Sequence, residues 1–205
     1  MASEGQGEFT RKRVGQIDLF LNKTEAMFGL FRKIYVKWLC LIGKAIDIRY
    51  NGTGDAYWLS NFLPYDFTFR DVKILSMESL LQGIKFKNPF IQDTVFRMSG
   101  KEAKHTGKNS EWYRDQTLYW RGEPMKRDSE EYQSFLREAY DALFLNTHFL
   151  LALGRTRGKK LYHTIGKSNP AKTVLTESEF CGILTRLRDE NRNLFKYLDE
   201  HTEDK

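Results

Sequence analysis

The stretch SMESLLQGIKF, residues 76–86, carries a carboxylate, an amide and an amine at steps of four and three residues. In a helix of 3.6 residues per turn, Glu78, Gln82 and Lys85 lie along one stripe. Ser76 is a suitable N-cap, because its hydroxyl can accept a hydrogen bond from a first-turn backbone N–H. Glu78 then lies near the positive end of the helix dipole, which favours a carboxylate.

Two interpretations of this polar stripe are open at this point. Polar stripes on helices are most often solvated surface, and spacing alone favours that interpretation. In the second interpretation, the stripe is one wall of a pocket. A helical rise of roughly 10 Å separates Glu78 from Lys85, which is too far for a simple ion pair but suits two groups that bracket a bound molecule.

Length and composition indicate one globular protein with a sizeable core. The chain has 205 residues, of which 40% are hydrophobic and 14% aromatic, and this composition excludes general disorder. A formal net charge of +6 favours an anionic partner, such as nucleic acid or a phosphate-bearing ligand. Cys40 and Cys181 lie far apart in apolar contexts, so they indicate buried thiols rather than a disulfide framework or a Cys-rich metal site.

Several familiar catalytic motifs are absent from the sequence. The phosphate-binding patterns G-x-G-x-x-G and G-x-x-x-x-G-K-[ST] do not occur, and neither does the esterase pattern G-x-S-x-G. The four histidines show neither H-E-x-x-H nor any paired spacing, so no zinc site is evident. We therefore expect a chemistry that uses no metal and no cofactor.

Residues 1–44 are interpreted as an N-terminal extension with an amphipathic helix. Its apolar segment 27–46 is interrupted by Arg32, Lys33 and Lys37, at a cost too large for an isolated membrane span. We expect a soluble helix whose inward side chains are Phe28, Phe31, Ile34, Tyr35 and Trp38. A basic helix on a membrane surface is the alternative. Because the N-terminus shows no secretory pattern, we expect a cytoplasmic location.

Residues 45–205 are expected to form a single domain, mainly α with a few short β-strands (α+β). AIDIRY predicts a strand, and LPYDFTFRDVKIL predicts a hairpin that turns at Asp71. Capping-box spacings then predict a series of helices. The paired residues are Ser99 with Glu102, Asp128 with Glu131, and Thr176 with Glu179. The segment 130–145 is expected to bury Leu136, Tyr140, Leu143 and Phe144.

Three stretches occur in a recognisable order: LSNFLPYDFTF, SMESLLQGIKF and SGKEAKHTGK. This succession resembles the NADAR family, also called YbiA-like, over roughly residues 45 to 190. Two later stretches, YWRGEPMKRDSEEYQSFLREAYDALF and LYHTIGKSNPAKTVLTESEFCGILTRLR, look like the branch that contains NADAR antitoxins and phage-encoded relatives. The resemblance implies a mainly α fold and an N-glycosidase that removes ADP-ribose from modified guanine bases in nucleic acid. Relatives in riboflavin pathways instead cleave small ribosylamino-pyrimidine phosphates.

The sequence departs from the riboflavin branch in two places. Where that branch usually has a Trp and an Asp-x-x-Trp-Gly segment, this chain has Asp128 and KSNPAK, residues 167–172. These departures disfavour a substrate of the riboflavin type. Trp120 is the candidate aromatic surface instead, and a buried structural Trp is the alternative.

Cleaving the bond between a ribose anomeric carbon and an amino nitrogen requires protonation of the departing base and stabilisation of positive charge on the sugar. We assign these tasks to Glu78. A covalent route is assigned to Lys85, because a partly desolvated lysine amine has a lowered pKa and can form a Schiff base with an opened sugar. The resemblance also favours this route. Simple binding of pyrophosphate is the alternative role for Lys85.

Six further residues are assigned to substrate binding: Ser60, Asn61, Phe62, Gln82, Trp120 and Lys167. Asn61 and Gln82 are expected to hydrogen-bond ribose hydroxyls, whereas Phe62 and Trp120 are expected to stack on a base. A purely structural role is the alternative for each of them.

The expected partner is ADP-ribosylated nucleic acid, DNA in preference to RNA, with free ADP-ribose as the product and no membrane partner. The expected setting is a bacterial cell in which this protein, bacterial or phage-encoded, reverses toxin ADP-ribosylation. The basic loop RTRGKK, residues 155–160, is a candidate for following the phosphate backbone, and a merely solvated loop is the alternative. Two other classes stay open: a non-catalytic binder of ADP-ribose or nucleic acid, and an N-glycosidase of a small ribosylamino metabolite.

Overall fold

The computed structural model describes residues 27–202 and divides the chain into two compact units, Met1–Gly43 and Lys44–Lys205. Residues 1–26 of the predicted extension lie outside the described part of the chain. No helix within residues 27–202 is both long and apolar enough to cross a membrane.

The first unit contains a helix that covers residues 27–41. The five side chains predicted to face inward are all exposed, by 53% to 70%: Phe28, Phe31, Ile34, Tyr35 and Trp38. The predicted burial is not observed among the residues that the structure describes, because helical periodicity identifies the apolar face of a helix but does not supply an element that covers it.

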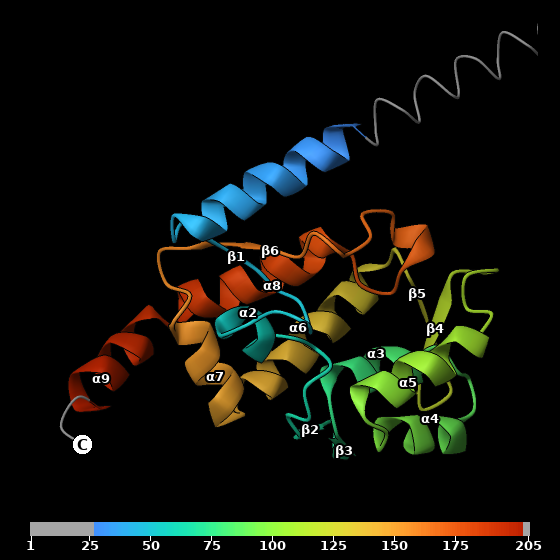
Figure 1. Ribbon diagram of the computed structural model, residues 1–205. Helices are drawn as coiled ribbons and strands as arrows, with labels where there is room; N and C mark the ends of the chain where they lie inside the picture. The colour runs from blue at the N-terminus through green and yellow to red at the C-terminus, as the bar shows by residue number, and fades with distance from the viewer. Residues whose placement is uncertain (1–26, 203–205) are drawn as a thin grey trace, which may run out of the picture. The chain divides into compact units, whose positions relative to one another are not determined.

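Strands in the second unit pair two by two. β1 (Ala45–Asp47) is parallel to β6 (Lys160–Tyr162), β2 (Phe67–Phe69) is antiparallel to β3 (Val72–Ile74), and β4 (Thr117–Trp120) is antiparallel to β5 (Glu123–Lys126). The helices are α2 (Asp55–Trp58), α3 (Met77–Gly83), α4 (Pro89–Phe96), α5 (Gly100–Thr106), α6 (Glu130–Phe144), α7 (Thr147–Gly154), α8 (Glu177–Glu190) and α9 (Arg192–Thr202), with short 3₁₀ turns at Gly107–Asn109 and Pro170–Lys172. The predicted fold class, mainly α with a few short strands, is confirmed (Figure 1).

Both antiparallel pairs are tight hairpins with left-handed turn residues. Arg70 and Asp71 join β2 to β3 with φ of 46° and 63°, and Arg121 and Gly122 join β4 to β5 with φ of 53° and 95°. The first hairpin was predicted from its alternating sequence and is confirmed. The second hairpin lies in a segment for which the sequence predicts only helices. The sequence does not reveal this hairpin because its strands are short and Arg-Gly is a weak hairpin signal.

Helix α6 lies at the centre of the second unit, where it packs against α3 and α8 (Figure 1). Its N-cap is Ser129, whose hydroxyl accepts from the Tyr132 N–H at 3.2 Å, one residue beyond the predicted cap Asp128. The four side chains predicted to be buried on this helix are all buried: Leu136, Tyr140, Leu143 and Phe144.

Trp120 belongs to the same core and not to a binding surface. It is 9% exposed, and its ring centroid lies 5.1 Å, 5.6 Å and 5.5 Å from those of Phe69, Phe96 and Phe135. The hairpin that the sequence did not reveal places Trp120 against α4 and α6. The predicted stacking of Trp120 on a base is therefore wrong, and the structural alternative is correct.

Helix α3 positions the polar stripe, and it packs against α4 and α5 (Figure 1). Ser76 is its N-cap, as predicted: the Ser76 hydroxyl accepts from the Ser79 N–H at 3.1 Å, and the Ser79 hydroxyl accepts from the Ser76 N–H at 3.0 Å. The helix ends at Gly83, where an added Cβ would lie 2.3 Å from the ring of Phe96. Lys85 therefore follows the helix instead of completing its stripe.

Candidate active site

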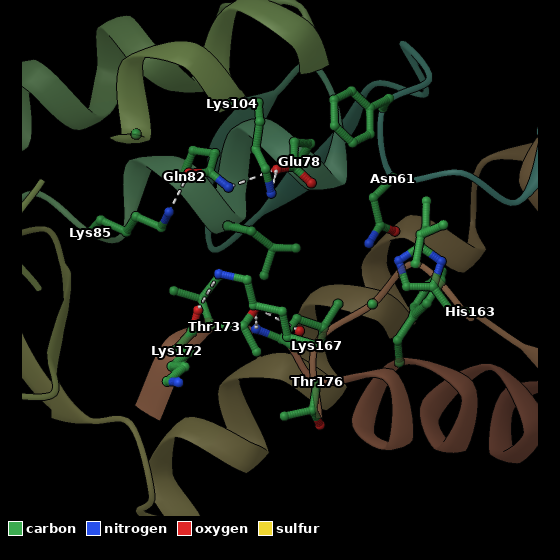
Figure 2. A pocket seen from close by; sticks show the side chains of 18 of the residues that line it. Asn61, Glu78, Gln82, Lys85, Lys104, His163, Lys167, Lys172, Thr173 and Thr176 are labelled. Atoms are coloured by element: carbon green, nitrogen blue, oxygen red, sulfur yellow. Dashed lines mark hydrogen bonds and ion pairs between the residues drawn. The ribbon is translucent and has the colours of Figure 1, made fainter. Parts of the chain in front are cut away.

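A pocket of about 530 Å³ opens in the second unit between α3, α5 and the segment 163–176. Figure 2 shows two facing walls, one formed by Glu78, Gln82, Lys85 and Lys104 and the other by the segment that carries Lys167. Seven of the eight predicted site residues line this pocket: Ser60, Asn61, Phe62, Glu78, Gln82, Lys85 and Lys167. The polar stripe is thus a pocket wall and not a solvated face.

Gln82 connects the two predicted catalytic residues. Its Nε2 donates to Glu78 Oε1 at 2.7 Å, and its Oε1 accepts from Lys85 Nζ (Figure 2). Gln82 is 1% exposed, and an added Cβ on Gly107 would lie 2.0 Å from its Oε1, so the neighbouring backbone leaves the amide little freedom. This geometry favours a positioning role for Gln82 over the predicted contact with ribose hydroxyls.

Lys104 on α5 completes the environment of the carboxylate. Its Nζ lies 3.0 Å from Glu78 Oε1, the same oxygen that accepts from Gln82, and Glu78 itself is only 5% exposed. Two donors therefore converge on one oxygen of Glu78 and fix the orientation of its side chain. The sequence pattern includes Lys104 in SGKEAKHTGK without a role, because its approach to Glu78 depends on how α5 packs against α3.

Lys85 has a strongly perturbed amine. Desolvation by burial is the main reason that its pKa falls from 10.5 to about 8; Lys104 and Lys167 lower this pKa further, whereas Glu78 raises it. A lysine with a pKa near 8 exists partly as the neutral amine at neutral pH, and the neutral amine is the nucleophilic form. The predicted lowering of the Lys85 pKa is confirmed.

Asn61 is held between the pocket and the core. The Tyr140 hydroxyl donates to Asn61 Oδ1 at 3.0 Å, and the Asn61 carbonyl accepts from the Glu78 N–H at 2.8 Å. Burial raises the pKa of Tyr140 well above its usual value, so its hydroxyl remains a donor. Because Oδ1 accepts from Tyr140, the NH₂ group is the part of the Asn61 amide that can donate into the pocket. Ser60 contributes to this turn, since its hydroxyl accepts from the Phe62 N–H at 3.4 Å.

The facing wall adds His163, which sequence reasoning did not identify, to the predicted Lys167. His163 Nδ1 lies 2.7 Å from the Ile48 carbonyl, so this nitrogen carries the proton, and burial lowers the pKa of the imidazole. Lys167 Nζ donates to the Lys172 carbonyl at 3.1 Å, and Lys108 also lines the pocket. No short motif in the sequence marks His163, because its position depends on the β1–β6 pairing.

Aromatic side chains supply much of the apolar lining, beside aliphatic ones. The aromatic side chains are Tyr50, Phe62, Trp112, Tyr113 and Phe180. The rings of Tyr50 and Phe62 lie 5.5 Å apart, centroid to centroid. Within residues 27–202, no group of three or more His, Cys, Asp or Glu side chains is placed to hold a metal ion. The described site therefore offers amines, a carboxylate, amides and ring faces as its chemistry.

The fold places the chain among small α+β proteins that include a solved structure from Escherichia coli. The NMR structure of the E. coli protein YbiA superposes with a TM-score of 0.50 and 18% sequence identity. The match covers 72% of this chain and 84% of the YbiA chain. At this identity the match shows the shared fold.

Residues 55–189 match the family described as Bacteriophage protein GP30.3. The chain is also 35% identical, over 147 residues, to an uncharacterized 17.1 kDa protein from the Gp30-rIII intergenic region of Enterobacteria phage T4; the match covers 70% of this chain and 97% of the phage protein. The chain belongs to the GP30.3 family, a NADAR-like family of phage-related proteins. The NADAR resemblance predicted from the sequence is confirmed.

Proposed function

We propose that the protein is a metal-independent N-glycosidase that removes ADP-ribose from ADP-ribosylated guanine bases in nucleic acid. The observation that carries this proposal is the amine of Lys85, whose pKa is lowered to about 8 and which is linked through Gln82 to the carboxylate of Glu78. A perturbed amine linked to a buried carboxylate, in a pocket, is an arrangement that suits covalent chemistry at a sugar carbon.

The size and charge of the pocket suit ADP-ribose. A volume of about 530 Å³ lies within the range of roughly 300–1,000 Å³ that is typical of small-molecule sites. The pyrophosphate carries negative charge, and five lysines line the pocket: Lys85, Lys104, Lys108, Lys167 and Lys172. Tyr50 and Phe62 offer ring faces on which adenine can stack.

The proposed reaction proceeds through a covalent intermediate. The C1′–O4′ bond of the ribose breaks as the lone pair of the base nitrogen forms a C1′=N iminium, and O4′ takes a proton from water; the neutral Nζ of Lys85 then adds to C1′. Glu78 stabilises the cationic sugar, takes the proton that Nζ loses, and transfers it to the departing amine as the C1′–N bond to the base breaks. Water then hydrolyses the imine between Lys85 and C1′, which releases free ADP-ribose and restores the amine.

Asn61 and His163 are proposed to orient the sugar. The Asn61 amide can donate to a ribose oxygen, because its own oxygen is engaged by Tyr140. The Nε2 of neutral His163 can accept from a ribose hydroxyl, because Nδ1 carries the proton. These contacts would hold C1′ in reach of Lys85, and such positioning accounts for much of the rate in enzymes.

The partner we propose is ADP-ribosylated DNA inside a bacterial cell, where a phage-encoded enzyme would reverse modification by a toxin. The family relationship and the net charge of +6 support this setting.

Turnover tests the proposal directly. Purified protein is incubated with oligonucleotides that carry ADP-ribosylated guanine or thymine, with an ADP-ribosylated protein, and with a small ribosylamino pyrimidine phosphate. We expect many equivalents of free ADP-ribose per protein from the guanine substrate, and none from Lys85→Arg, which keeps the charge but cannot form an imine. Retention of one equivalent of uncleaved ligand would identify a binding protein, and cleavage of the small metabolite alone would identify a metabolic enzyme.

A further inference from the structure

A second cavity adjoins the proposed active site. It has a volume of about 480 Å³, and three of the residues that line it also line the first pocket: Lys85, Ser110 and Trp112. Lys85 therefore lies in the wall that separates the two cavities. Trp112 and Ser110 are 8% and 7% exposed, so this wall is well packed.

Hydrogen bonds connect the walls of the second cavity to the backbone next to Lys85. The Tyr119 N–H donates to the Ile84 carbonyl at 2.7 Å, next to Lys85 in sequence, and the side chain of Gln92 donates to the carbonyls of Phe86 and Tyr119 at 2.7 Å and 2.8 Å. Tyr119 and Phe86 both line the cavity. These hydrogen bonds connect the walls of the cavity to the segment that carries the proposed nucleophile.

An N-glycosidase needs two subsites that meet at the nucleophile. The sugar must lie on one side of the attacked carbon and the leaving base on the other, because both ends of the scissile bond must be oriented during attack. Of the two predicted catalytic residues, Lys85 lines both cavities, whereas Glu78 lines the first pocket alone. The first pocket carries most of the lysines, so it suits the pyrophosphate.

We infer that the second cavity is the subsite for the leaving base and the adjoining nucleic-acid strand. This inference rests on the proposed function and assigns a place to the part of the substrate that the ADP-ribose pocket does not hold. Phe86 and Tyr119 are partly exposed and line this cavity, so they supply aromatic surface on which an unpaired base stacks. The base reaches this subsite only when it is unstacked, so single-stranded or flipped nucleotides are the substrates.

Glu111 is the residue that reads the base. Guanine presents N–H donors on its Watson–Crick edge, and a carboxylate that lines the cavity can accept from them. Glu111 is paired with Arg114 at 2.6 Å, with both side chains at least 60% exposed. Such an exposed ion pair contributes little, so the base can replace Arg114 as the partner of Glu111. Arg114 and Lys87 then remain at the cavity for phosphates of the strand.

Glu111→Gln tests base reading, with Glu123→Gln as a matched control on the exposed strand β5. Both glutamates are exposed, so neither variant threatens the fold. For Glu111→Gln we expect kcat/KM on a single-stranded ADP-ribosylguanine oligonucleotide to fall roughly tenfold or more, the effect of losing a charged hydrogen-bond acceptor. Affinity for free ADP-ribose, measured by calorimetry, should stay within about twofold, because the product occupies only the first pocket.

Lys87→Gln tests the strand contact, with Lys196→Gln on α9 as the control. We expect the slope of log K against log salt for oligonucleotide binding to become shallower by about 0.7, the value for one phosphate contact on a single strand. Lys196→Gln should leave the slope unchanged, because Lys196 lies outside both cavities.

The outcomes separate this inference from the function on which it rests. Oligonucleotide-specific losses in Glu111→Gln and Lys87→Gln, with unchanged ADP-ribose affinity, support the subsite. A wild-type enzyme that turns over while both variants match their controls overturns the subsite and leaves the N-glycosidase proposal intact. A wild-type protein that releases no ADP-ribose from any substrate overturns both proposals.

Discussion

The pH dependence of the reaction follows from the amine of Lys85. Burial and the neighbouring lysines lower its pKa from 10.5 to about 8. At pH 7 a lysine with a pKa of 8 is about 9% neutral, whereas an ordinary lysine is about 0.03% neutral, so the pocket enriches the nucleophilic form roughly 300-fold. If this amine attacks the sugar, kcat/KM should rise about tenfold per pH unit below pH 8 and level off above it.

Two variants should move this profile in opposite directions. Lys104→Gln removes a cation that lowers the pKa of Lys85, so the rise should shift to higher pH. Glu78→Gln removes the carboxylate that raises the pKa of Lys85, so the rise in kcat/KM should shift to lower pH. The same variant should also lower the rate at every pH by about 100-fold, because it loses the proton-transfer group. Lys104→Arg keeps the charge and is the control whose profile should stay in place.

The assay is the initial rate of ADP-ribose release from an ADP-ribosylguanine oligonucleotide between about pH 6 and pH 10, at constant ionic strength, with substrate below KM. A flat profile across this range would refute the neutral amine as the attacking group. A wild-type rise near pH 8 that Lys104→Gln leaves in place would show that Lys104 does not set the reactivity of Lys85.

Three further substitutions probe how the site is held. Gly107→Ala puts a Cβ 2.0 Å from Gln82 Oε1, so it should displace this side chain and lower kcat by about 10–100-fold, as measured by single-turnover kinetics. Lys85→Met should abolish turnover but raise the free energy of unfolding in urea at pH 7 by about 1–2 kcal/mol. The reason is that folding lowers the pKa of Lys85 from 10.5 to about 8, so the charged amine destabilises the native state at pH 7. This gain should decrease above pH 8 and vanish as the pH rises through 10.5. Arg127→Met should lower the free energy of unfolding by about 3–5 kcal/mol, because it leaves Glu179 without the buried guanidinium that donates to both carboxylate oxygens at 2.9 Å and 2.6 Å.

Local sequence signals predicted the elements that carry the site. The caps at Ser99 and Thr176 depend on residues three positions away, and each forms the expected reciprocal pair, while Ser76 caps α3 as predicted. Likewise, the periodicity of α6 identified its buried face, because helical spacing is a local property.

What the sequence could not supply is contact between distant segments. Lys104 reaches Glu78 only through the packing of α5 on α3, and His163 reaches the pocket only through the parallel pairing of β1 and β6. Trp120 was misassigned for the same reason, since its surroundings come from α4 and α6. In RTRGKK, Arg155 and Arg157 pair with Asp55 and Asp199, which favours a structural role for part of that loop.

Trapping of the covalent intermediate tests the central claim most directly. Protein that is turning over an ADP-ribosylguanine substrate is treated with borohydride, digested, and mapped by mass spectrometry. Reduction of the imine should leave a stable secondary amine that adds the mass of reduced ADP-ribose to Lys85 alone, and Lys85→Arg should show neither adduct nor turnover. An adduct on Lys104 or Lys167, or an active Lys85→Arg protein, would contradict the account and leave Lys85 as a charge that binds phosphate.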